Sequence, residues 1–313
     1  MNLAASRRDF LRLAGAGAAL TLAGCGSGSV ASAIHPQRFY VLGDGFSDVG
    51  QTGAMATVND GTLNWIQALA AYYGVTVAPV VGGGTGYAQA YARVDSPDTT
   101  SGYNAPSVTQ QVDLLLAHTT FEYDDLVFIN GGMHDIVDAV TAGGISADTT
   151  AAVKAAGQAL AAQVRRLVED GGAQHVVVTG VYNLALSPWG RSTGFAPATG
   201  FDDSAPLNQL SNTFNNNGLK VAIADMGANV LYFDAGLFYN LIGSKPQNYA
   251  INDAEHAVCN TPDALTCTPD TVIDPNYSNY LFADSLHFTP AAQRMFVSES
   301  YATNVYTQLR QRW

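Results

Sequence analysis

Charged residues are scarce in this chain of 313 residues, and basic residues are the scarcest. Charged residues make up 13% of the sequence, and 14 Lys and Arg stand against 26 Asp and Glu, for a formal net charge of −12. Hydrophobic residues make up 47%. A disordered chain or a coiled coil would be rich in charge and poor in apolar residues, so both classes are excluded. The shortage of cations disfavours electrostatic attraction to nucleic acid, and no nucleic-acid partner is expected.

A hydrophobic run long enough to span a membrane is also missing. The apolar run 13–24 would extend over roughly 18 Å as a helix, which is less than the ~30 Å hydrocarbon core of a bilayer. It also lacks the polar face of an ordinary amphipathic helix. The run therefore fits the hydrophobic region of a signal peptide better than a transmembrane anchor.

Two short motifs around this run predict export and lipid anchoring. Residues 6–11 resemble the twin-arginine export signal S-R-R-x-F-L. Residues 22–25 resemble a bacterial lipobox, in which the cysteine, here Cys25, is acylated and becomes the first residue of the mature chain. We interpret 1–24 as a signal peptide and 25–36 as a flexible tether, with the lipid holding the protein to a membrane in the periplasm or on the cell surface. The alternative is a stretch of small residues with a chance cysteine.

Cysteine is nearly absent, with three residues in the whole chain. Besides Cys25, the sequence has Cys259 and Cys267 at the two ends of a turn-rich stretch. In the oxidising compartment that export implies, these two predict a disulfide that closes a small surface loop and stabilises the fold by ~2–3 kcal/mol. A metal site is the weaker alternative, because only His256 lies close by and no second Cys/His pair completes a ligand set. Neither a metal nor a cofactor is expected.

From residue 37 onward, short apolar runs alternate with longer amphipathic ones. Runs rich in β-branched and aromatic residues predict strands over 38–43, 125–130, 175–180 and 229–234. A weaker run predicts a fifth strand over 74–77. Apolar residues at helical spacing predict helices over 62–73, 110–117, 147–170, 206–226 and 289–310. This alternation indicates one α/β domain over 37–313, with a mostly parallel five-stranded sheet covered on both faces. The segments 187–204 and 242–280 are rich in Gly, Pro, Asn and Asp, which predicts long loops of the kind that form lids or bind ligands.

Two polar blocks stand out in the sequence, one at the carboxyl end of the first predicted strand and one before the last predicted helix. The C-terminal edge of a parallel sheet is where catalytic groups of this kind collect. The first strand runs directly into the block G-D-G-F-S-D-V-G over 43–50. The last predicted helix is preceded by the block D-S-L-H over 284–287. An aspartate three residues before a histidine on one loop can orient the imidazole and stabilise its cation, as hydrolytic triads require.

Together, in this order and on these elements, the two blocks resemble those of the GDSL (SGNH) hydrolase family, over nearly the whole mature chain. The resemblance implies a three-layer α/β/α flavodoxin-like fold and the hydrolysis of carboxylic esters, with a small-molecule or lipid ester as the ligand. The family's first block reads G-D-S-x-S-D, and its first serine is the nucleophile. Gly45 occupies that position here, and because glycine has no hydroxyl, covalent serine catalysis from it is impossible. The Asp284–His287 pair does match the family.

Two further family blocks are altered. The block that normally supplies an asparagine amide to the oxyanion hole aligns with residues 132–135, which carry His134 at that position. A neutral imidazole donates one N–H, so His134 stays a candidate oxyanion donor. A glycine-containing block aligns with residues 86–92 and has Tyr91 where a glycine is usual. The resemblance therefore implies an altered oxyanion hole built from Gly45, Tyr91 and His134.

The missing nucleophile leaves several functions open. Ser47 is a candidate surrogate nucleophile, although a turn or helix-capping role is the simpler interpretation. A water molecule activated directly by His287 is another route and would give only weak hydrolysis. Two functions remain, namely an exported ester hydrolase whose turnover is impaired, and a non-catalytic pseudo-hydrolase that binds ligands at the cell surface. His118, His175 and His256 are interpreted as surface or structural histidines.

Overall fold

Four parallel strands form the central sheet of the structure, a computed structural model that describes residues 34–301 and 304–313. The strands lie in the order β1-β2-β3-β4, with bounds β1 Phe39–Leu42, β2 Leu126–Asn130, β3 His175–Thr179 and β4 Val230–Phe233. Every residue of β1, β2 and β3 is buried, as expected of a parallel sheet that is covered on both faces. The predicted signal peptide and Cys25 lie outside the described residues.

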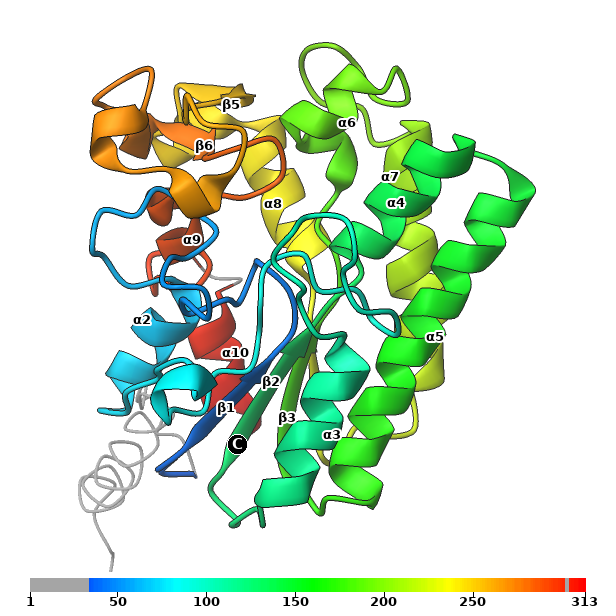
Figure 1. The fold of residues 1–313 in the computed structure, drawn as a ribbon, viewed down its shortest axis with the longest axis vertical. Helices are drawn as coiled ribbons and strands as arrows, with labels where there is room; N and C mark the ends of the chain where they lie inside the picture. Colours follow the sequence, from blue (N-terminus) through cyan, green and yellow to red (C-terminus); the bar gives the residue numbers. More distant parts are fainter. Residues whose placement is uncertain (1–33, 302–303) are drawn as a thin grey trace, which may run out of the picture.

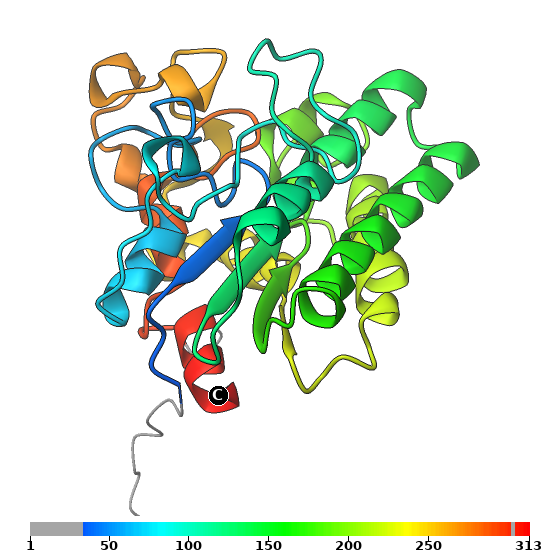
Figure 2. The same cartoon turned by 60° about the horizontal axis from the view of Figure 1, so that its bottom comes forward.

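Helices cover the sheet from both sides (Figure 1). One side carries α3 Val108–His118, α4 Met133–Gly143, α5 Ala147–Glu169, α7 Pro206–Asn212 and the π-helical segment η3 Thr213–Lys220. The other side carries α2 Trp65–Tyr72, α9 Pro290–Met295 and α10 Val305–Arg312. Figure 2 shows α10 on one side of the strands and α3 and α5 on the other. The α/β architecture predicted from the alternating runs is therefore confirmed.

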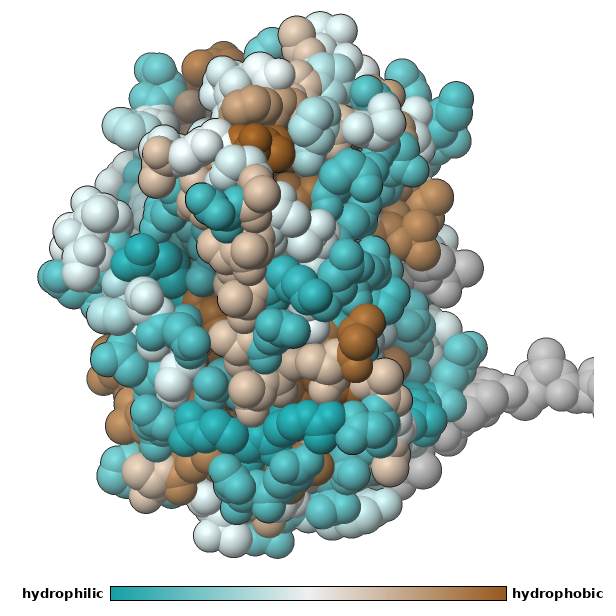
Figure 3. Space-filling view, turned by 90° about the vertical axis from the view of Figure 1, so that its right-hand side faces the viewer, coloured by the Kyte–Doolittle hydropathy of each residue, from teal (hydrophilic) through white to brown (hydrophobic). Residues whose placement is uncertain are grey.

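Local sequence signals set the ends of these helices. Ser107 and Asn64 each begin a helix, α3 and α2, with a capping box that satisfies two backbone donors. The long helix α5 begins after Ser146, whose side chain accepts a hydrogen bond from a backbone N–H of the first turn. It is followed by Gly172, which has φ +76 and ends the helix in the left-handed conformation that glycine adopts freely. Helix α5 packs against η3, β3 and its neighbouring helices. Figure 3 shows weakly hydrophobic residues in a band among hydrophilic ones on the outer side of the molecule.

The predicted fifth strand is wrong, because the described residues form four strands in the main sheet. Residues 74–77 are not paired, and the free edge of β1 is met by a later segment instead. Val41 donates its N–H to the Thr85 carbonyl at 3.1 Å, and Tyr87 donates to the Val41 carbonyl at 2.6 Å. Only isolated bridges form there, one at Gly86 with Val41. Pro79, two residues after the predicted strand, forms a second isolated bridge with Gly86.

One predicted helix is divided, and another contains a π-helical section. The predicted helix 289–310 is divided into α9 and α10, with a turn directly after α9. The predicted helix 206–226 runs without a break from α7 through the π-helical η3 to residue 222. Two helices that the periodicity missed, α4 and α8 Ala235–Ser244, begin directly after strands. Asp234 explains the second, because its side chain accepts from the Leu237 N–H at 2.8 Å and caps α8.

The predicted long loop 242–280 contains a small sheet of its own. Strands β5 Asp253–Ala257 and β6 Tyr280–Phe282 pair in parallel. The other predicted loop, 187–204, contains the short helix α6 Pro188–Ser192. The β5–β6 sheet and α6 lie together at the top of the molecule in Figure 1, above the carboxyl ends of the main strands. Within the described ranges, no helix combines the length and the apolar character needed to cross a membrane.

Candidate active site

The loop after β1 is held by its neighbours. The Gly43 N–H donates to Gln111 Oε1 at 2.7 Å, and its carbonyl accepts from Gln111 Nε2 at 2.9 Å. Gly43 has φ +142, and a Cβ there would lie 2.1 Å from a side-chain oxygen of β2, so only glycine fits. Phe46 stacks on Trp65 with ring centroids 5.3 Å apart and accepts the indole N–H at 2.7 Å. These contacts on either side fix the position of Gly45.

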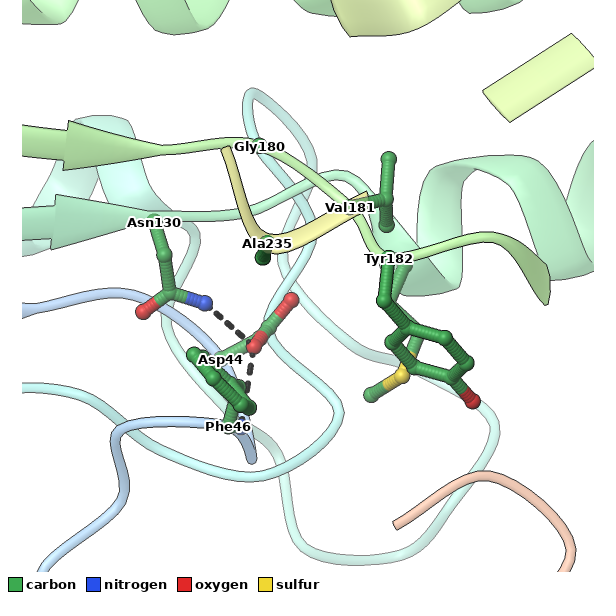
Figure 4. A pocket seen from close by; sticks show the side chains of 8 residues that line it. Asp44, Phe46, Asn130, Gly180, Val181, Tyr182 and Ala235 are labelled. Atoms are coloured by element: carbon green, nitrogen blue, oxygen red, sulfur yellow. Dashed lines mark hydrogen bonds between the residues drawn. The ribbon is translucent and has the colours of Figure 1, made fainter. Parts of the chain in front are cut away.

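Asp44 lies in a buried polar site beside this loop (Figure 4). Its Oδ1 accepts hydrogen bonds from the Phe46 N–H at 3.0 Å and from Asn130 Nδ2 at 2.6 Å. Burial raises the pKa of Asp44, although these donors oppose the rise. The adjoining cavity, lined also by Val181 and Tyr182, measures about 10 Å³, which is room for one water molecule at most. Asp44 therefore holds the loop and does not face an open cleft.

Asp284 and His287 form a buried acid–base pair just beyond β6. Asp284 Oδ1 accepts from the Leu286 N–H at 2.8 Å and the His287 N–H at 2.7 Å, and Oδ2 lies 2.9 Å from His287 Nδ1. The Ala264 N–H also donates to Oδ2, at 3.0 Å. Burial alone would raise the pKa of Asp284, but the charge and hydrogen bonds of His287 and the backbone amides lower it to about 2. Burial disfavours the charged imidazole, yet Asp284 outweighs it and the pKa of His287 is raised.

The imidazole of His287 lies directly against Gly45. A Cβ added to Gly45 would be 2.5 Å from His287 Nε2 and 3.2 Å from the Cβ of Ala56. The ring thus occupies the space that any larger side chain at position 45 would need. Nε2 is buried and has no hydrogen-bond partner among the described residues. The structure therefore brings together Gly45, Asp284 and His287, as the resemblance implies.

His134 joins this group from the first turn of α4. Its ring centroid lies 6.4 Å from that of His287 and 4.9 Å from that of Tyr91. Burial and the neighbouring His287 lower the pKa of His134 to about 3, so the ring is neutral at physiological pH. Its Nε2 is buried, without a hydrogen-bond partner in the part of the chain that the structure describes.

Tyr91 covers His134 in a backbone conformation that is unusual for a bulky residue. Its φ is +70, in the left-handed region where glycine is favoured. The ring stacks on Tyr103 with centroids 5.4 Å apart, and the hydroxyl donates to Asp263 Oδ2 at 2.8 Å. The neighbouring Ala90 N–H donates to a buried aspartate at 2.9 Å, so that amide is engaged within the protein. The side chain of Tyr91 thus lies at the site.

Ser47 is placed differently from the other predicted site residues. It is buried and lines a small cavity in the core with Trp65 and Phe128. His287 lines another cavity, with Gly45. The Ser47 N–H also donates to the Asp44 carbonyl at 3.1 Å, as in a turn. Both observations agree with the interpretation of Ser47 as a turn residue. Within residues 34–301 and 304–313, no group of three or more His, Cys, Asp or Glu side chains is arranged to hold a metal ion.

The predicted disulfide is present, and its loop supplies contacts that the sequence did not reveal. Cys259 and Cys267 are bonded, with Cα atoms 5.8 Å apart. Between them lie the Ala264 amide that binds Asp284 and the Asp263 carboxylate that binds Tyr91. No motif marks these two residues, because their role depends on where the loop folds back.

A second Asp-x-x-His turn, Asp253–His256, begins β5. Its Nδ1 to Oδ2 distance is also 2.9 Å, but the His256 side chain is 73% exposed. The interpretation of His256 as a surface histidine is confirmed. The repeated Asp-x-x-His spacing is visible in the sequence and was the signal that could have found this pair.

The family model for GDSL-like lipase/acylhydrolase matches residues 39–299, and the chain belongs to this family. The matched range contains the loop of Gly45, both altered blocks and the Asp284–His287 pair. The chain is also similar to a solved structure, a member of the lipolytic protein G-D-S-L family from Veillonella parvula DSM 2008. That match has 14% identity and a TM-score of 0.41, and it covers 83% of this chain and 93% of the other. The sequence matches no curated protein significantly.

Proposed function

We propose that this protein is an exported member of the acylhydrolase family whose site receives a carboxylic ester but forms no acyl-enzyme. The observation that carries the proposal is the contact between Gly45 and His287. The imidazole lies where a nucleophile side chain would begin, 2.5 Å from a Cβ at position 45. In a serine hydrolase the histidine takes a proton from the serine hydroxyl, and no such hydroxyl exists at this position.

The remaining chemistry of the site is weak hydrolysis by water. The Asp284–His287 pair is oriented as a general base. Because no serine hydroxyl is present, His287 would remove a proton from a water molecule near its Nε2. Loss of the nucleophile from a triad costs on the order of 10⁶ in turnover. The expected ester turnover is therefore very low.

The second candidate is a non-catalytic ligand-binding module, and two ring nitrogens favour it. Nε2 of His134 and Nε2 of His287 are both buried without partners among the described residues. Leaving a buried polar group unpaired costs roughly 1–3 kcal/mol. An ester or carboxylate oxygen would accept from Nε2–H of His134, and from Nε2–H of His287 when that ring is protonated, because in its neutral form Nδ1 donates to Asp284 and Nε2 accepts. In this candidate the site binds a ligand but does not hydrolyse it.

Export and lipid anchoring through Cys25 are part of the proposal, supported by the twin-arginine and lipobox-like motifs. Mass spectrometry of the protein isolated from bacterial membranes tests them. We expect a mature chain that begins at Cys25 and carries acyl mass. A mature chain that begins elsewhere, or one without acyl mass, would remove this part of the proposal.

The test of the catalytic proposal is a comparison of hydrolysis of short- and long-chain p-nitrophenyl esters by three forms of the protein. We expect near-zero turnover by the unmodified chain and a gain of several orders of magnitude in Gly45→Ser, because a shift of the His287 ring admits the serine and the Asp284–His287 pair then supplies the base. Gly45→Ala is the matched control, since it makes the same steric demand on His287 without supplying a hydroxyl. Adding His287→Ala to Gly45→Ser should abolish the gain.

Two outcomes would redirect the proposal. If folded Gly45→Ser stays silent on every ester, the binding module replaces the impaired hydrolase. Its own test is then a change in the ring resonances of His134 and His287 on addition of carboxylates to the unmodified protein. If a fluorophosphonate labels the unmodified chain at Ser47, that residue is a working nucleophile and the role given to Gly45 is wrong.

A further inference from the structure

The disulfide loop, residues 259–267, is a compact turn at the edge of the site. A disulfide joins its two ends. A short 3-10 turn over Ala264–Thr266 lies inside it, and Asp263 caps this turn by accepting the Leu265 N–H on Oδ1 at 2.8 Å. The loop therefore has a defined shape with which to hold neighbouring groups.

One backbone amide of the disulfide loop binds the aspartate of the acid–base pair. The Ala264 N–H donates to Asp284 Oδ2 at 3.0 Å. The donors from Leu286 and His287 belong to the turn of Asp284 itself and bind Oδ1. Oδ2 is the oxygen that lies 2.9 Å from His287 Nδ1. Oδ1 lies 3.1 Å from the same nitrogen, so the loop fixes the nearer of the two oxygens that face the imidazole.

A second group of contacts joins the disulfide loop to the cover over His134. Asp263 Oδ2 accepts the hydroxyl of Tyr91 at 2.8 Å, and the Tyr91 ring lies 4.9 Å from His134. Leu265 packs in a small apolar cluster with Ala90, against which Tyr91 also packs. The same loop therefore holds both the acid and the tyrosine that closes the site.

A third contact ties the disulfide loop to the segment that follows the Gly45 block. Asn59 Nδ2 donates to the carbonyls of Ala264 and Cys267, both at 3.1 Å. The Asn59 N–H donates to the Cys267 carbonyl at 2.9 Å. Three segments that are distant in sequence therefore meet on this loop.

We propose that the disulfide loop is the positioning element of the site, with the Ala264 amide and the Asp263 carboxylate as positioning groups for His287 and Tyr91. The inference rests on the proposed role of His287 as the base. A disulfide restricts the conformations of its loop, so the amide is held in place before a ligand arrives. Groups that orient an acid–base pair from outside it commonly control its reactivity.

The first test is an NMR titration of His287 in the full-length protein. The titratable groups that act on this imidazole include Asp44, Asp48, Asp263, Asp284 and His134. The negative charge of Asp263 raises the pKa of His287, so we expect Asp263→Asn, which retains the disulfide and an acceptor for the cap, to lower it. The matched control is Asp274→Asn, which removes a similar turn-capping carboxylate outside the loop and should leave the titration unchanged. An unchanged His287 titration in Asp263→Asn would refute the role of Asp263.

The second test follows the Nδ1 proton of His287, which exchanges slowly with water only while Asp284 holds it. We expect this resonance in the oxidised protein and its loss after selective reduction of the disulfide. The ring resonances of His175, on β3, serve as the reference for an intact fold. Persistence of the Nδ1 proton resonance after complete reduction would overturn the positioning role of the loop. Cys259→Ser with Cys267→Ser provides the same comparison without a reductant.

A kinetic test separates this inference from the proposed function. In the Gly45→Ser background, Tyr91→Phe should change KM more than kcat, because the hydroxyl holds the cover and does not touch the reacting atoms. Tyr277→Phe is the matched control. The Tyr277 hydroxyl donates to Asp60 Oδ2 at 3.1 Å, and neither group contacts His287. If Gly45→Ser is inactive while the NMR effects appear, the proposed function fails and the positioning role stands. If Gly45→Ser is active and the NMR effects are absent, the positioning role fails alone.

Discussion

The structure contains two Asp-x-x-His turns, one exposed and one buried, with nearly the same hydrogen bonds. In the exposed turn, Asp253 Oδ1 accepts the Glu255 N–H at 2.8 Å and the His256 N–H at 2.9 Å. In the buried turn, the corresponding distances at Asp284 are 2.8 Å and 2.7 Å. The distance from the histidine Nδ1 to the aspartate Oδ2 is 2.9 Å in both. Spacing along the chain is therefore enough to build the pair.

What differs is the environment of each pair. The side chains of His256 and Asp253 are 73% and 27% exposed, whereas those of His287 and Asp284 are 4% and 6% exposed. Only the buried pair has a backbone donor from another loop and a glycine against its Nε2, among the contacts of the described residues. Water screens an exposed pair, while the low dielectric of the interior strengthens a buried one. The comparison shows that burial, rather than local geometry, distinguishes a candidate base from a surface histidine.

The largest expected difference between the two pairs is catalytic. In the Gly45→Ser background, Asp284→Asn should lower kcat on the order of 10⁴, as expected when a triad aspartate no longer fixes the histidine tautomer. Asp253→Asn in the same background should leave ester turnover within about twofold, because a screened surface pair is not coupled to the site. Steady-state assays with a p-nitrophenyl ester measure both. Equal losses would show that the buried pair has no special role.

The next difference is in stability. Asp284→Ala should lower the free energy of unfolding by about 3–5 kcal/mol, because it leaves a buried histidine and three backbone N–H groups without their acceptor. Asp253→Ala should cost about 1 kcal/mol or less, as is typical of exposed pairs. Urea unfolding at neutral pH gives both values. A similar cost for the two variants would contradict the contrast in burial.

A smaller effect is the pH dependence of stability. The pKa of Asp284 is lowered to about 2 in the folded state, so its contribution is present above the unfolded value near 4 and is lost as pH falls through about 2. The pKa of His287 is raised, so its contribution is present below the unfolded value and is lost as pH rises through the folded value. The stability gap between the unmodified chain and Asp284→Asn should therefore be widest in mildly acidic solution. Urea unfolding across pH measures this gap, and a gap that widens below pH 2 would contradict the assignment.

The smallest expected effect is the response to salt. The cost of Asp253→Asn at pH 5 should shrink by a few tenths of a kcal/mol when salt is raised to about 1 M, because exposed charges are screened. The cost of Asp284→Asn should change less, since the buried pair is shielded from ions. Unfolding curves at two salt concentrations measure the difference. A larger salt response in the buried pair would show that water and ions reach it.

The main elements of the fold could be predicted because their signals are local. Continuous apolar runs predicted the four strands, and apolar residues at helical spacing predicted the helices found as α2, α3 and α5. The fifth strand was wrong because pairing at the edge of β1 depends on which distant segment reaches it, here residues 85–88. The small β5–β6 sheet was missed for the same reason. Its strands are short, and their pairing is a long-range contact.

Residue type and short spacing along the chain are enough to specify the Asp-x-x-His turns, the glycine at position 45 and the pair of cysteines. Tertiary structure decided that one turn is buried and the other exposed, that His287 Nε2 lies against Gly45, and that the disulfide loop places an amide on Asp284. Burial and contacts between distant segments arise from packing the whole chain around one core, and they cannot be read from a local pattern. The chemistry left to this site depends on those contacts.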